Sequence, residues 1–486
     1  MTMSPRPALC GAHQTLSAAE VAARIAQLAA SLRALRPRAR MLGVIADNSP
    51  EWIVVDLAAQ RAGVSLVPLP GFFTLAQMQH AVDTTGMDAL FCAMPEMALA
   101  LGFERKTLEG AELPWFRRDA QPVAVPVGTS KITFTSGTTG APKGVCLSAM
   151  QQRAVAVALV QATNHIRIER HLSLLPLSVL LENVAGVTAP RLALATCCVP
   201  PLAEVGVLGA TEFDPLICLD AIERWQADSV ILLPQMLLAL TAALEAGVPR
   251  PSTLRFAAVG GAKVAPALIA RARAVGLPAY EGYGLSECAS VVALNVPGAD
   301  RPGSVGRALS HVDVRINDNH EIEVAQSDLL GYLGVEAPTS KWLHTGDLGR
   351  IDEDGFLYID GRYKHQLITS FGRNVAPEWP EAELIATAVI AQAAVFGEAR
   401  PRLCAVIVPR LHAVTDAAID AAVRVANHQL PDYAQIAHWI RAPEAFSARN
   451  GLATPNRRVR RDAVWKHYRA RLESLYETNS DVRAFL

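Results

Sequence analysis

The sequence of 486 residues lacks the patterns that mark several common classes of protein. The eight cysteines are scattered, and only Cys197 and Cys198 are adjacent. No CxxC pair and no Cys/His metal spacing occurs, so neither a zinc site nor a disulfide framework is indicated. No run of about 20 apolar residues is present, so we expect no membrane-spanning segment.

An excess of charge of one sign is also missing. The formal net charge is −1, from 45 basic and 46 acidic residues. This balance gives no bulk attraction to nucleic acid, which we exclude as a partner. The N-terminus shows no basic-then-apolar signal segment, and we expect a cytoplasmic protein. Peripheral contact with a membrane is left open.

The composition that is present suits a large enzyme with sizeable cores. Hydrophobic residues make up 51% of the chain, and the mean hydropathy is +0.22. The length favours more than one domain. Apolar runs predict strands at 42–46, 64–69, 229–233 and 254–259, and helices at 17–36, 51–62, 236–246 and 265–275. Ser17 is the expected N-cap of the first helix, with Glu20 three residues later. This alternation predicts an α/β fold with mostly parallel, helix-covered sheets.

The pattern changes after residue 295. Short strands are expected at 312–316, 321–324, 348–352 and 356–359, with a hairpin turn at 352–355. They predict a small β-rich subdomain at the end of a large N-terminal domain. We place the domain boundary between Gly361 and Arg362, which gives domains of residues 1–361 and 362–486. The second is expected to be a small α+β lobe.

Residues 133–144 form the most informative segment. Hydroxyls, three glycines and Lys143 follow a strand-like run at 130–134. Such a loop can wrap a polyphosphate, because glycines let the backbone approach while N–H groups, hydroxyls and the lysine bind charge. It is not a Walker A loop, since Pro142 precedes the lysine and Gly144 follows it. From composition alone, a Ser/Thr/Gly surface loop is the competing interpretation.

Further segments, in order along the chain, decide between the two interpretations. They lie at 281–287, 343–347, 360–364, 368–377 and 454–458. Together with the loop they resemble the adenylate-forming (AMP-binding) superfamily, which includes acyl-CoA synthetases, peptide-synthetase adenylation domains and firefly luciferase. The resemblance extends from about residue 16 to about residue 476. The stretches 360–364, 374–377 and 395–398 look most like long-chain acyl-CoA synthetases.

The resemblance implies a fold and a reaction. The C-terminal lobe is expected to be mobile and to rotate about a hinge at Lys364 between two half-reactions. An apolar carboxylic acid, most simply a fatty acid, is expected to react with ATP to form an acyl-adenylate. The acyl group is then expected to pass to the thiol of CoA. ATP and Mg²⁺ are the implied cofactors, with CoA as the thiol substrate.

The resemblance also implies roles for individual residues. The phosphates are assigned to Thr135, Ser136, Gly137, Thr138, Thr139, Gly140 and Lys143. The magnesium ligand is Glu287, beside a phosphate-binding Ser286. The adenine site is assigned to Gly261, Ala262, Tyr283 and Gly284, and the ribose site to Asp347 and Arg362. Taken singly, each of these is also typical of a turn residue or a surface ion pair.

The chain departs from the family pattern at a catalytic position. The lysine that bridges carboxylate and α-phosphate in the family aligns with Arg458, or with Arg457 after a one-residue slip. Arginine keeps the charge but is bulkier and planar. A nucleotide-binding homologue with little ligase activity is therefore one alternative. A ligase that loads a carrier protein or an amine is another.

The acid is expected to bind among aliphatic side chains. The candidate lining segments are 179–187, 232–240 and 259–263. Val179 and Leu181 stand where fatty acyl-CoA synthetases commonly carry a histidine and an aromatic residue, which predicts a less gated acyl site. No acidic residue is placed to hold an α-ammonium group, so an amino acid is disfavoured. Fatty and aromatic acids both remain open.

Overall fold

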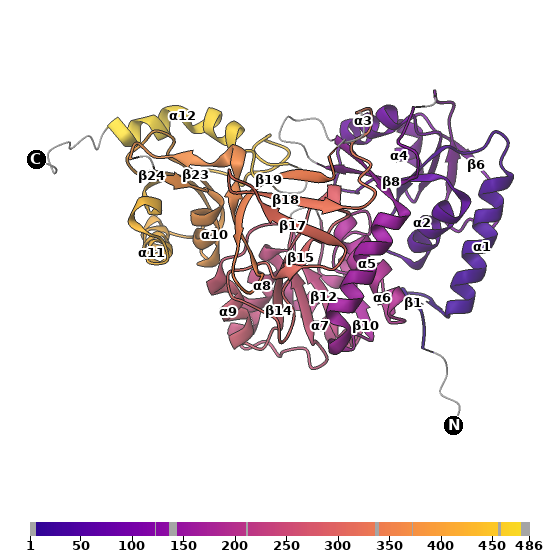
Figure 1. Ribbon diagram of the computed structural model, residues 1–486, viewed down its shortest axis with the longest axis horizontal. Coiled ribbons are helices and arrows are strands. Elements are labelled where there is room, and N and C mark those ends of the chain that lie inside the picture. The colour runs from indigo at the N-terminus through magenta and orange to yellow at the C-terminus, as the bar shows by residue number, and fades with distance from the viewer. Residues whose placement is uncertain are drawn as a thin grey trace, which may run out of the picture.

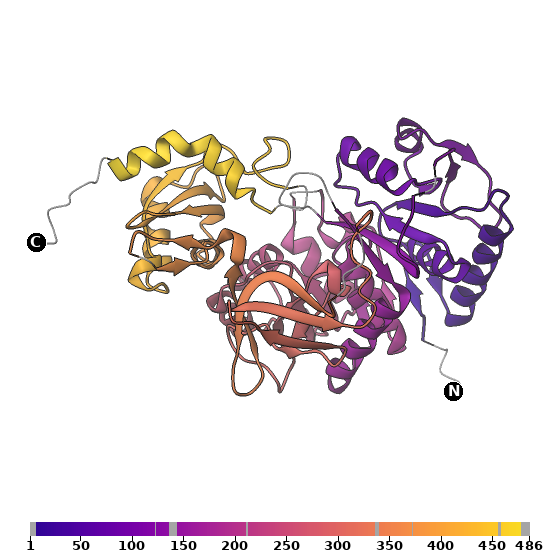
Figure 2. The ribbon, with the colours of Figure 1, turned by 45° about the horizontal axis from the view of Figure 1, so that its top comes forward.

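The computed structural model describes residues 6–121, 123–135, 143–209, 212–335, 340–371, 373–454 and 458–477. Two large, mostly parallel sheets form the body of the chain, followed by a smaller antiparallel sheet and a C-terminal lobe (Figure 1). The N-terminal helices lie at one end of the molecule and the C-terminal lobe at the other (Figures 1 and 2). The predicted α/β architecture is confirmed.

The first sheet has the strand order β6-β7-β5-β3-β4-β8-β9. Its neighbours β5–β3–β4–β8 are parallel, whereas the edges are antiparallel. The strands are β3 (Met41–Ile45), β4 (Ser65–Pro68), β5 (Ala89–Cys92), β6 (Glu104–Lys106), β7 (Trp115–Arg117), β8 (Thr129–Thr135) and β9 (Lys143–Ser148).

Helices cover both faces of this sheet because its side chains alternate between the faces. Leu42 and Val44 of β3 join one core, while Met41 and Ile45 join another. The first core includes α1 (Ala18–Ala34) and α2 (Pro50–Ala62), and the second includes α3 (Leu75–Thr85) and α4 (Pro95–Ala100).

Local sequence signals set the ends of these helices. The hydroxyl of Ser17 accepts from the N–H of Glu20, and the Glu20 carboxylate accepts from the N–H of Ser17, which is the predicted capping box. Helix α2 starts after the cap Ser49 and ends at Gly63, which has a left-handed φ of 71°.

The second sheet has the order β16-β15-β14-β13-β12-β10-β11-β1-β2 and is parallel from β14 to β1. Its strands are β1 (Leu9–Cys10), β2 (Thr15–Leu16), β10 (Arg170–Leu172), β11 (Thr196–Cys198), β12 (Ser229–Leu232), β13 (Phe256–Val259), β14 (Ala279–Tyr283), β15 (Ala293–Leu294) and β16 (Arg307–Ala308). The helical segments around it are α5 (Ala149–Thr163), η1 (Asn164–Ile166), the π-helix η2 (Glu182–Thr188), α6 (Ala189–Leu192), η3 (Leu202–Val205), α7 (Pro215–Arg224), α8 (Pro234–Glu245) and α9 (Pro266–Ala274).

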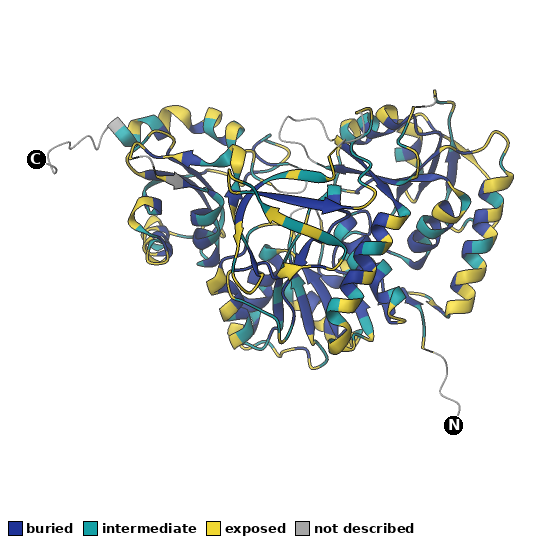
Figure 3. Cartoon of the chain, in the orientation of Figure 1, coloured by how far each residue is buried: buried dark blue, intermediate teal, exposed yellow. Residues whose placement is uncertain are grey.

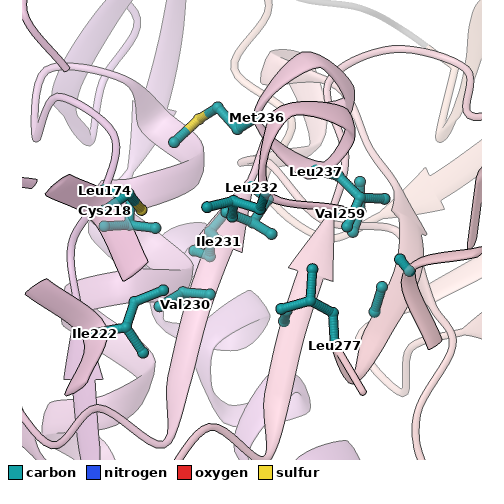
Figure 4. Packing of buried hydrophobic residues seen from close by; sticks show 14 of the residues in the cluster. Leu174, Cys218, Ile222, Val230, Ile231, Leu232, Met236, Leu237, Val259 and Leu277 are labelled. Atoms are coloured by element: carbon teal, nitrogen blue, oxygen red, sulfur yellow. The ribbon is translucent and has the colours of Figure 1, made fainter. Parts of the chain in front are cut away.

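Figure 4 shows how β12 is buried. Val230, Ile231 and Leu232 meet Cys218 and Ile222 of α7 and the first turn of α8. In Figure 3 the inner strands of the two large sheets are mostly dark blue and the outward faces of the helices are yellow, whereas β17 is teal and yellow. All eight cysteines are buried and free. In the described part of the chain, no helix is both long enough and apolar enough to cross a bilayer.

The β-rich region is an antiparallel sheet of β17 (Val312–Ile316), β18 (Glu321–Gln326), β19 (Trp342–Ile351) and β20 (Leu357–Arg362). The predicted strands and hairpin turn are present. Strand β19 is longer than expected, because it starts at Trp342 and carries the 343–347 motif before a register shift at Leu348.

The C-terminal lobe follows β20. It contains η5 (Tyr363–His365), β21 (Leu367–Ile368), β22 (Asn374–Val375), α10 (Glu378–Ala386), β23 (Ile390–Phe396), β24 (Leu403–Pro409), α11 (Asp416–Asn427), η6 (Asp432–Ala434), β25 (Ile436–Arg441) and α12 (Arg461–Glu477). Helix α10 contacts the large domain, because Ala386 packs into the core of the second sheet. The guanidinium of Arg271 also donates to the Ala386 carbonyl at 2.6 Å.

Candidate active site

A cleft of about 3040 Å³ lies between the sheets and the C-terminal lobe. Its lining comes from the ends of β8, β13 and β14, from η2 and α8, and from the β19–β20 sheet. The lobe contributes Lys364 and the turn that carries Arg458. Segments far apart in the sequence are therefore brought to one opening.

Strands β8 and β9 present the two ends of the phosphate-loop motif to this cleft. Thr135, the last residue of β8, is paired with Lys143, the first residue of β9. Both line the cleft. The predicted phosphate ligands Ser136, Gly137, Thr138, Thr139 and Gly140 lie outside the described residues.

Glu287 is held at two points in η4 (Ser286–Cys288), which follows β14. Its backbone carbonyl accepts from the side-chain amide of Gln151 at 2.8 Å. Its Oε1 accepts from the hydroxyl of Tyr332 at 2.6 Å. Ser286, beside it, also lines the cleft.

Tyr332 connects this carboxylate to the phosphate-loop lysine. The Nζ of Lys143 lies 5.8 Å from the centroid of the Tyr332 ring, within the range of a cation–π contact. Burial and the Glu287 carboxylate raise the pKa of Tyr332, so the phenol stays protonated and donates. The sequence analysis missed this residue, because a tyrosine between short strands carries no signal of its own.

Asp347, Arg362 and Tyr283 form a second polar group. Arg362 Nε lies 2.7 Å from Asp347 Oδ1, and the Tyr283 hydroxyl donates to Asp347 Oδ2 at 2.6 Å. Burial raises the pKa of Asp347, although Arg362, Tyr283 and Arg458 favour its ionised form. A carboxylate with a fixed guanidinium beside it can recognise neighbouring hydroxyls.

Arg458 lies within electrostatic reach of this group. It sits in a turn in which its N–H donates to the Thr454 hydroxyl at 3.0 Å. Loss of hydration and the nearby Arg362 lower the pKa of Arg458, while Asp347 and Glu287 oppose that shift. The side chain is open to the cleft. Arg457, the alternative after a register slip, lies outside the described residues.

Glycines that follow β13 and β14 line part of the cleft. Gly261 has a left-handed φ of 89° and is exposed beside Ala262. A Cβ at Gly284 would lie 1.5 Å from the Ser290 carbonyl oxygen, so no larger residue fits there. Gly261, Ala262, Tyr283 and Gly284 all line the cleft, and we call this part of the lining the slot.

Two charged residues near this slot were not predicted. Burial raises the pKa of Glu281 to about 8, although a hydrogen bond from the Val264 N–H favours the ionised carboxylate. Lys263 donates to the Ile359 carbonyl at 2.9 Å, and burial lowers its pKa. Glu281 was visible only as part of a motif, and its burial could not be read from the sequence.

The wider part of the cleft is mostly apolar. Residues of all three predicted lining segments reach it, among them Val179, Leu181, Met236 and Val259. The polar lining residues include His171 and Ser229, whose side chains lie 2.8 Å apart. The other nitrogen of His171 lies 3.0 Å from Glu182 Oε1.

The carboxylate of Glu287 has the chemistry that a magnesium ion requires. Mg²⁺ prefers oxygen ligands and usually takes one or two carboxylates, together with water and substrate phosphates. In the described part of the chain, Oε1 of Glu287 is bonded to Tyr332 and Oε2 accepts no hydrogen bond. The second oxygen is thus available to a cation.

Comparison with known families agrees with this geometry. Residues 2–339 match the family of AMP-binding enzymes, and residues 364–480 match the AMP-binding enzyme C-terminal domain. The chain belongs to the AMP-binding enzyme family. The predicted membership of the adenylate-forming superfamily is therefore confirmed.

Relatives of this adenylate-forming enzyme carry several acid specificities. A feruloyl-CoA synthase from Amycolatopsis is 30% identical over 80% of this chain and 81% of its own length. A human long-chain-fatty-acid–CoA ligase is 24% identical over 90% of this chain and 78% of its own. The structure of an O-succinylbenzoate coenzyme A synthetase from Bacillus subtilis, in complex with ATP and a magnesium ion, has a TM-score of 0.75 and 22% identity. It covers 95% of this chain and 97% of its own.

The predicted enzyme class, an ATP-dependent and AMP-forming acid–CoA ligase, is confirmed at this level. The names of these relatives include an aromatic and a fatty acid specificity. The predicted preference for a fatty acid is therefore not decided by the comparisons.

Proposed function

We propose that this adenylate-forming enzyme activates an apolar carboxylic acid with ATP and transfers the acyl group to CoA. One observation carries the proposal. Glu287, the Asp347–Arg362 pair and Arg458 meet the two strand ends of the phosphate-loop motif in one cleft that continues into an apolar pocket. The surfaces proposed to bind the nucleotide and the acid thus share one opening.

In the proposed adenylation, a carboxylate oxygen of the acid attacks the α-phosphorus of ATP. The bond to the β-phosphate breaks and pyrophosphate leaves, so an acyl-adenylate forms. Arg458 is proposed to bridge the two negative reactants, and Lys143 to bind the outer phosphates with Thr135. Such catalysis rests on alignment and charge stabilisation.

Asp347 and Arg362 are proposed to bind the ribose, and the slot of Gly261, Ala262, Tyr283 and Gly284 to hold the adenine. Glu287 is proposed to bind magnesium through its free oxygen, beside Ser286. When bound, that ion would neutralise phosphate charge. The loop residues Ser136, Gly137, Thr138, Thr139 and Gly140, which lie outside the described residues, keep their proposed role in binding phosphate.

In the second half-reaction, the sulfur of CoA attacks the acyl carbonyl carbon, AMP leaves and a thioester forms. We place the domain boundary at Gly361–Arg362 and the hinge at Lys364, which is exposed in η5. Rotation of residues 362–486 would remove Arg458 and admit the thiol. Exposure of the hinge residue is compatible with such a movement.

The proposed acid is apolar, because aliphatic side chains dominate the pocket beyond the phosphate site. Fatty and aromatic acids satisfy the same chemistry, and a fatty acid is the simpler match to an aliphatic lining.

The test is a product analysis with a panel of acids. The protein is incubated with ATP, Mg²⁺ and fatty or aromatic acids of graded size, and the nucleotide products are separated. AMP and pyrophosphate are expected with at least one apolar acid. ADP and phosphate as main products would overturn the proposed reaction.

The acceptor is tested with the acid that gives the fastest pyrophosphate release. CoA, a pantetheinylated carrier protein and simple amines are compared at equal concentration. Thioester formation with CoA is expected to dominate. Faster transfer to the carrier protein or the amine would assign the enzyme to a biosynthetic ligase, and no release with any acid would indicate a nucleotide-binding homologue.

A further inference from the structure

The segment around Tyr332 is joined to the strand that follows the phosphate-loop motif. The N–H of Cys146 donates to the Gly331 carbonyl at 2.9 Å, and the N–H of Leu333 donates to the Gly144 carbonyl at 2.8 Å. Tyr332 itself forms a bridge with Val145. A short stretch between β18 and β19 thus adds to the edge of the first sheet, directly beside Lys143.

This attachment places one side chain between two functional groups from different elements. The Tyr332 hydroxyl donates to Glu287 Oε1 at 2.6 Å, within the usual range for a hydroxyl bound to a carboxylate. The face of its ring lies 5.8 Å from Lys143 Nζ. The carboxylate comes from η4 and the ammonium from β9, so Tyr332 spans the two.

The backbone of Glu287 is fixed separately. The amide of Gln151 donates to the Glu287 carbonyl at 2.8 Å and to Gln326 Oε1 at 3.0 Å, and both glutamines are buried. The main chain at Glu287 is therefore held without Tyr332. Tyr332 instead fixes the orientation of the carboxylate. Because its hydroxyl binds Oε1, Oε2 points away from the tyrosine.

We propose that Tyr332 is a positioning residue of the magnesium and phosphate site, with separate tasks for its hydroxyl and its ring. The hydroxyl orients the Glu287 carboxylate for the cation, and the ring holds the Lys143 ammonium ready for phosphate. The inference rests on the proposed function, because it takes Glu287 and Lys143 as the groups that meet Mg²⁺ and ATP.

Two substitutions of Tyr332 distinguish the role of its hydroxyl from the role of its ring. Tyr332→Phe removes the hydroxyl and keeps the ring, so the magnesium-dependent part of ATP binding should weaken. Hydrogen-bond partners of metal ligands typically change metal affinity by about 10- to 100-fold. Tyr332→Leu removes the ring as well, so ATP binding without the metal should also weaken.

The experiment measures ATP binding by titration calorimetry on the full chain, without any acid, in EDTA and at a series of Mg²⁺ concentrations. For Tyr332→Phe we expect an unchanged affinity for ATP in EDTA. The Mg²⁺ concentration that produces half of the increase in ATP affinity should be roughly 10-fold higher. For Tyr332→Leu we expect the same shift and, in addition, a severalfold weaker affinity in EDTA.

Tyr358 provides a matched control. Its hydroxyl donates to Asp352 Oδ2 at 3.2 Å, and the guanidinium of Arg350 lies 3.9 Å from its ring centroid. Tyr358→Phe also removes a hydroxyl bonded to a carboxylate from a ring that contacts a cation. It should leave the affinity for ATP unchanged, both in EDTA and in Mg²⁺. Thermal unfolding of all variants checks that they fold.

The outcomes separate this inference from the proposed function. If the unaltered protein binds ATP with a magnesium-dependent affinity and Tyr332→Phe matches it, the positioning role is wrong. Equal weakening by Tyr332→Phe in EDTA and in Mg²⁺ would also overturn the role, because it would indicate a general structural effect. If the unaltered protein binds no ATP under any condition, the proposed function itself fails.

Discussion

At the scale of single residues, Arg458 is the most informative, because it is predicted to stand where the family has a lysine. It points to the cleft from a tight turn and shares the neighbourhood of Asp347, Arg362 and Glu287. The nearby Arg362 disfavours the charge of Arg458, and the reacting carboxylate and α-phosphate would add negative charge beside it in the proposed reaction. A planar guanidinium can bind both, whereas a lysine acts as a point charge.

We expect Arg458→Ala to slow acyl-adenylate formation, measured by pyrophosphate exchange, by about 10²–10³-fold. Removal of one well-placed donor at a developing charge typically costs about 2.7–4 kcal/mol. Thioester formation from supplied acyl-adenylate should hardly change. Arg458→Lys should retain or raise adenylation. If Arg457→Ala is impaired and Arg458→Ala is not, the motif is displaced by one residue.

Glu281 gives the folded protein a pH dependence of its own. Its pKa of about 8 lies above the ordinary value of 4.5, because burial disfavours the charged carboxylate. Between these values the unfolded chain is ionised and the folded chain is not. The free energy of unfolding should therefore fall as the pH rises from about 4.5 to about 8, with a slope of up to about 1.4 kcal/mol per pH unit.

Urea unfolding of the unaltered protein and of Glu281→Gln tests this dependence. The variant lacks the titrating group but keeps Lys263 and Asp300, the charged groups that act on Glu281. The difference in unfolding free energy between the two proteins should change with pH over this range and be constant above it. Parallel curves throughout would contradict the raised pKa.

At the scale of elements, the π-helix η2 is fixed by a buried polar chain. Its Glu182 contacts His171 on β10, and His171 contacts Ser229 on β12. Glu182 Oε2 also accepts from the Leu175 N–H at 3.1 Å. The element that lines the acyl pocket is thereby joined to two strands, and π-helical turns are frequent at functional sites.

We expect Gly186→Ala to break this attachment. A Cβ at Gly186 would lie 2.0 Å from Glu182 Oε1 and 2.7 Å from His171 Nε2. Overpacking of this kind costs about 1–3 kcal/mol of unfolding free energy, and urea unfolding measures it. Gly71→Ala is the control, since nothing lies within 4 Å of its Cβ position. If both variants are equally stable, η2 adjusts without cost.

At the scale of the whole molecule, the lobe packs against the large domain in the orientation that the proposed adenylation requires. Arg458 faces Asp347 and Glu287, and α10 packs against the core of the second sheet through Ala386. Arg271 of α9 is the cation at this contact, and it also pairs with Glu245 at 2.7 Å. The orientation therefore depends on contacts remote from the chemistry.

We expect Arg271→Ala to reduce adenylation more than thioester formation from supplied acyl-adenylate, by up to about tenfold. A hydrogen bond from a charged donor contributes about 1.5–3 kcal/mol, and about 1.4 kcal/mol corresponds to a factor of ten. Pyrophosphate exchange and thioester assays measure the two steps. Glu245→Gln removes the ion pair but keeps the bond to Ala386, so it should leave the ratio of the rates unchanged.

The hinge offers a second test of lobe movement. Lys364→Pro fixes φ near −65° and restricts rotation at the proposed hinge. The two half-reactions should then be lost unequally, whichever orientation the proline favours. Equal loss of both in a protein that stays folded would argue against a rotating lobe.

The sequence by itself determined the elements and the family. Apolar periodicity and caps such as Ser17 predicted α1, and a buried run predicted β3, because both signals act over a few neighbouring residues. The motif residues Glu287, Asp347 and Arg362 could be proposed as a group from their order along the chain. The start of β19 was predicted at residue 348, although the strand begins at Trp342. The polar motif at 343–347 hides the alternation of apolar and polar residues that marks a strand.

Only the tertiary structure decided how these segments meet. Tyr332 and the His171–Glu182 pair carry no local signal, and the motif that contains Glu281 does not show its burial. The chemistry of these residues arises from burial and from partners distant in the sequence. Arg458 acquires its place beside Asp347 through the docking of a separate lobe. Such contacts depend on the packing of elements that are remote along the chain, and no short-range pattern contains that information.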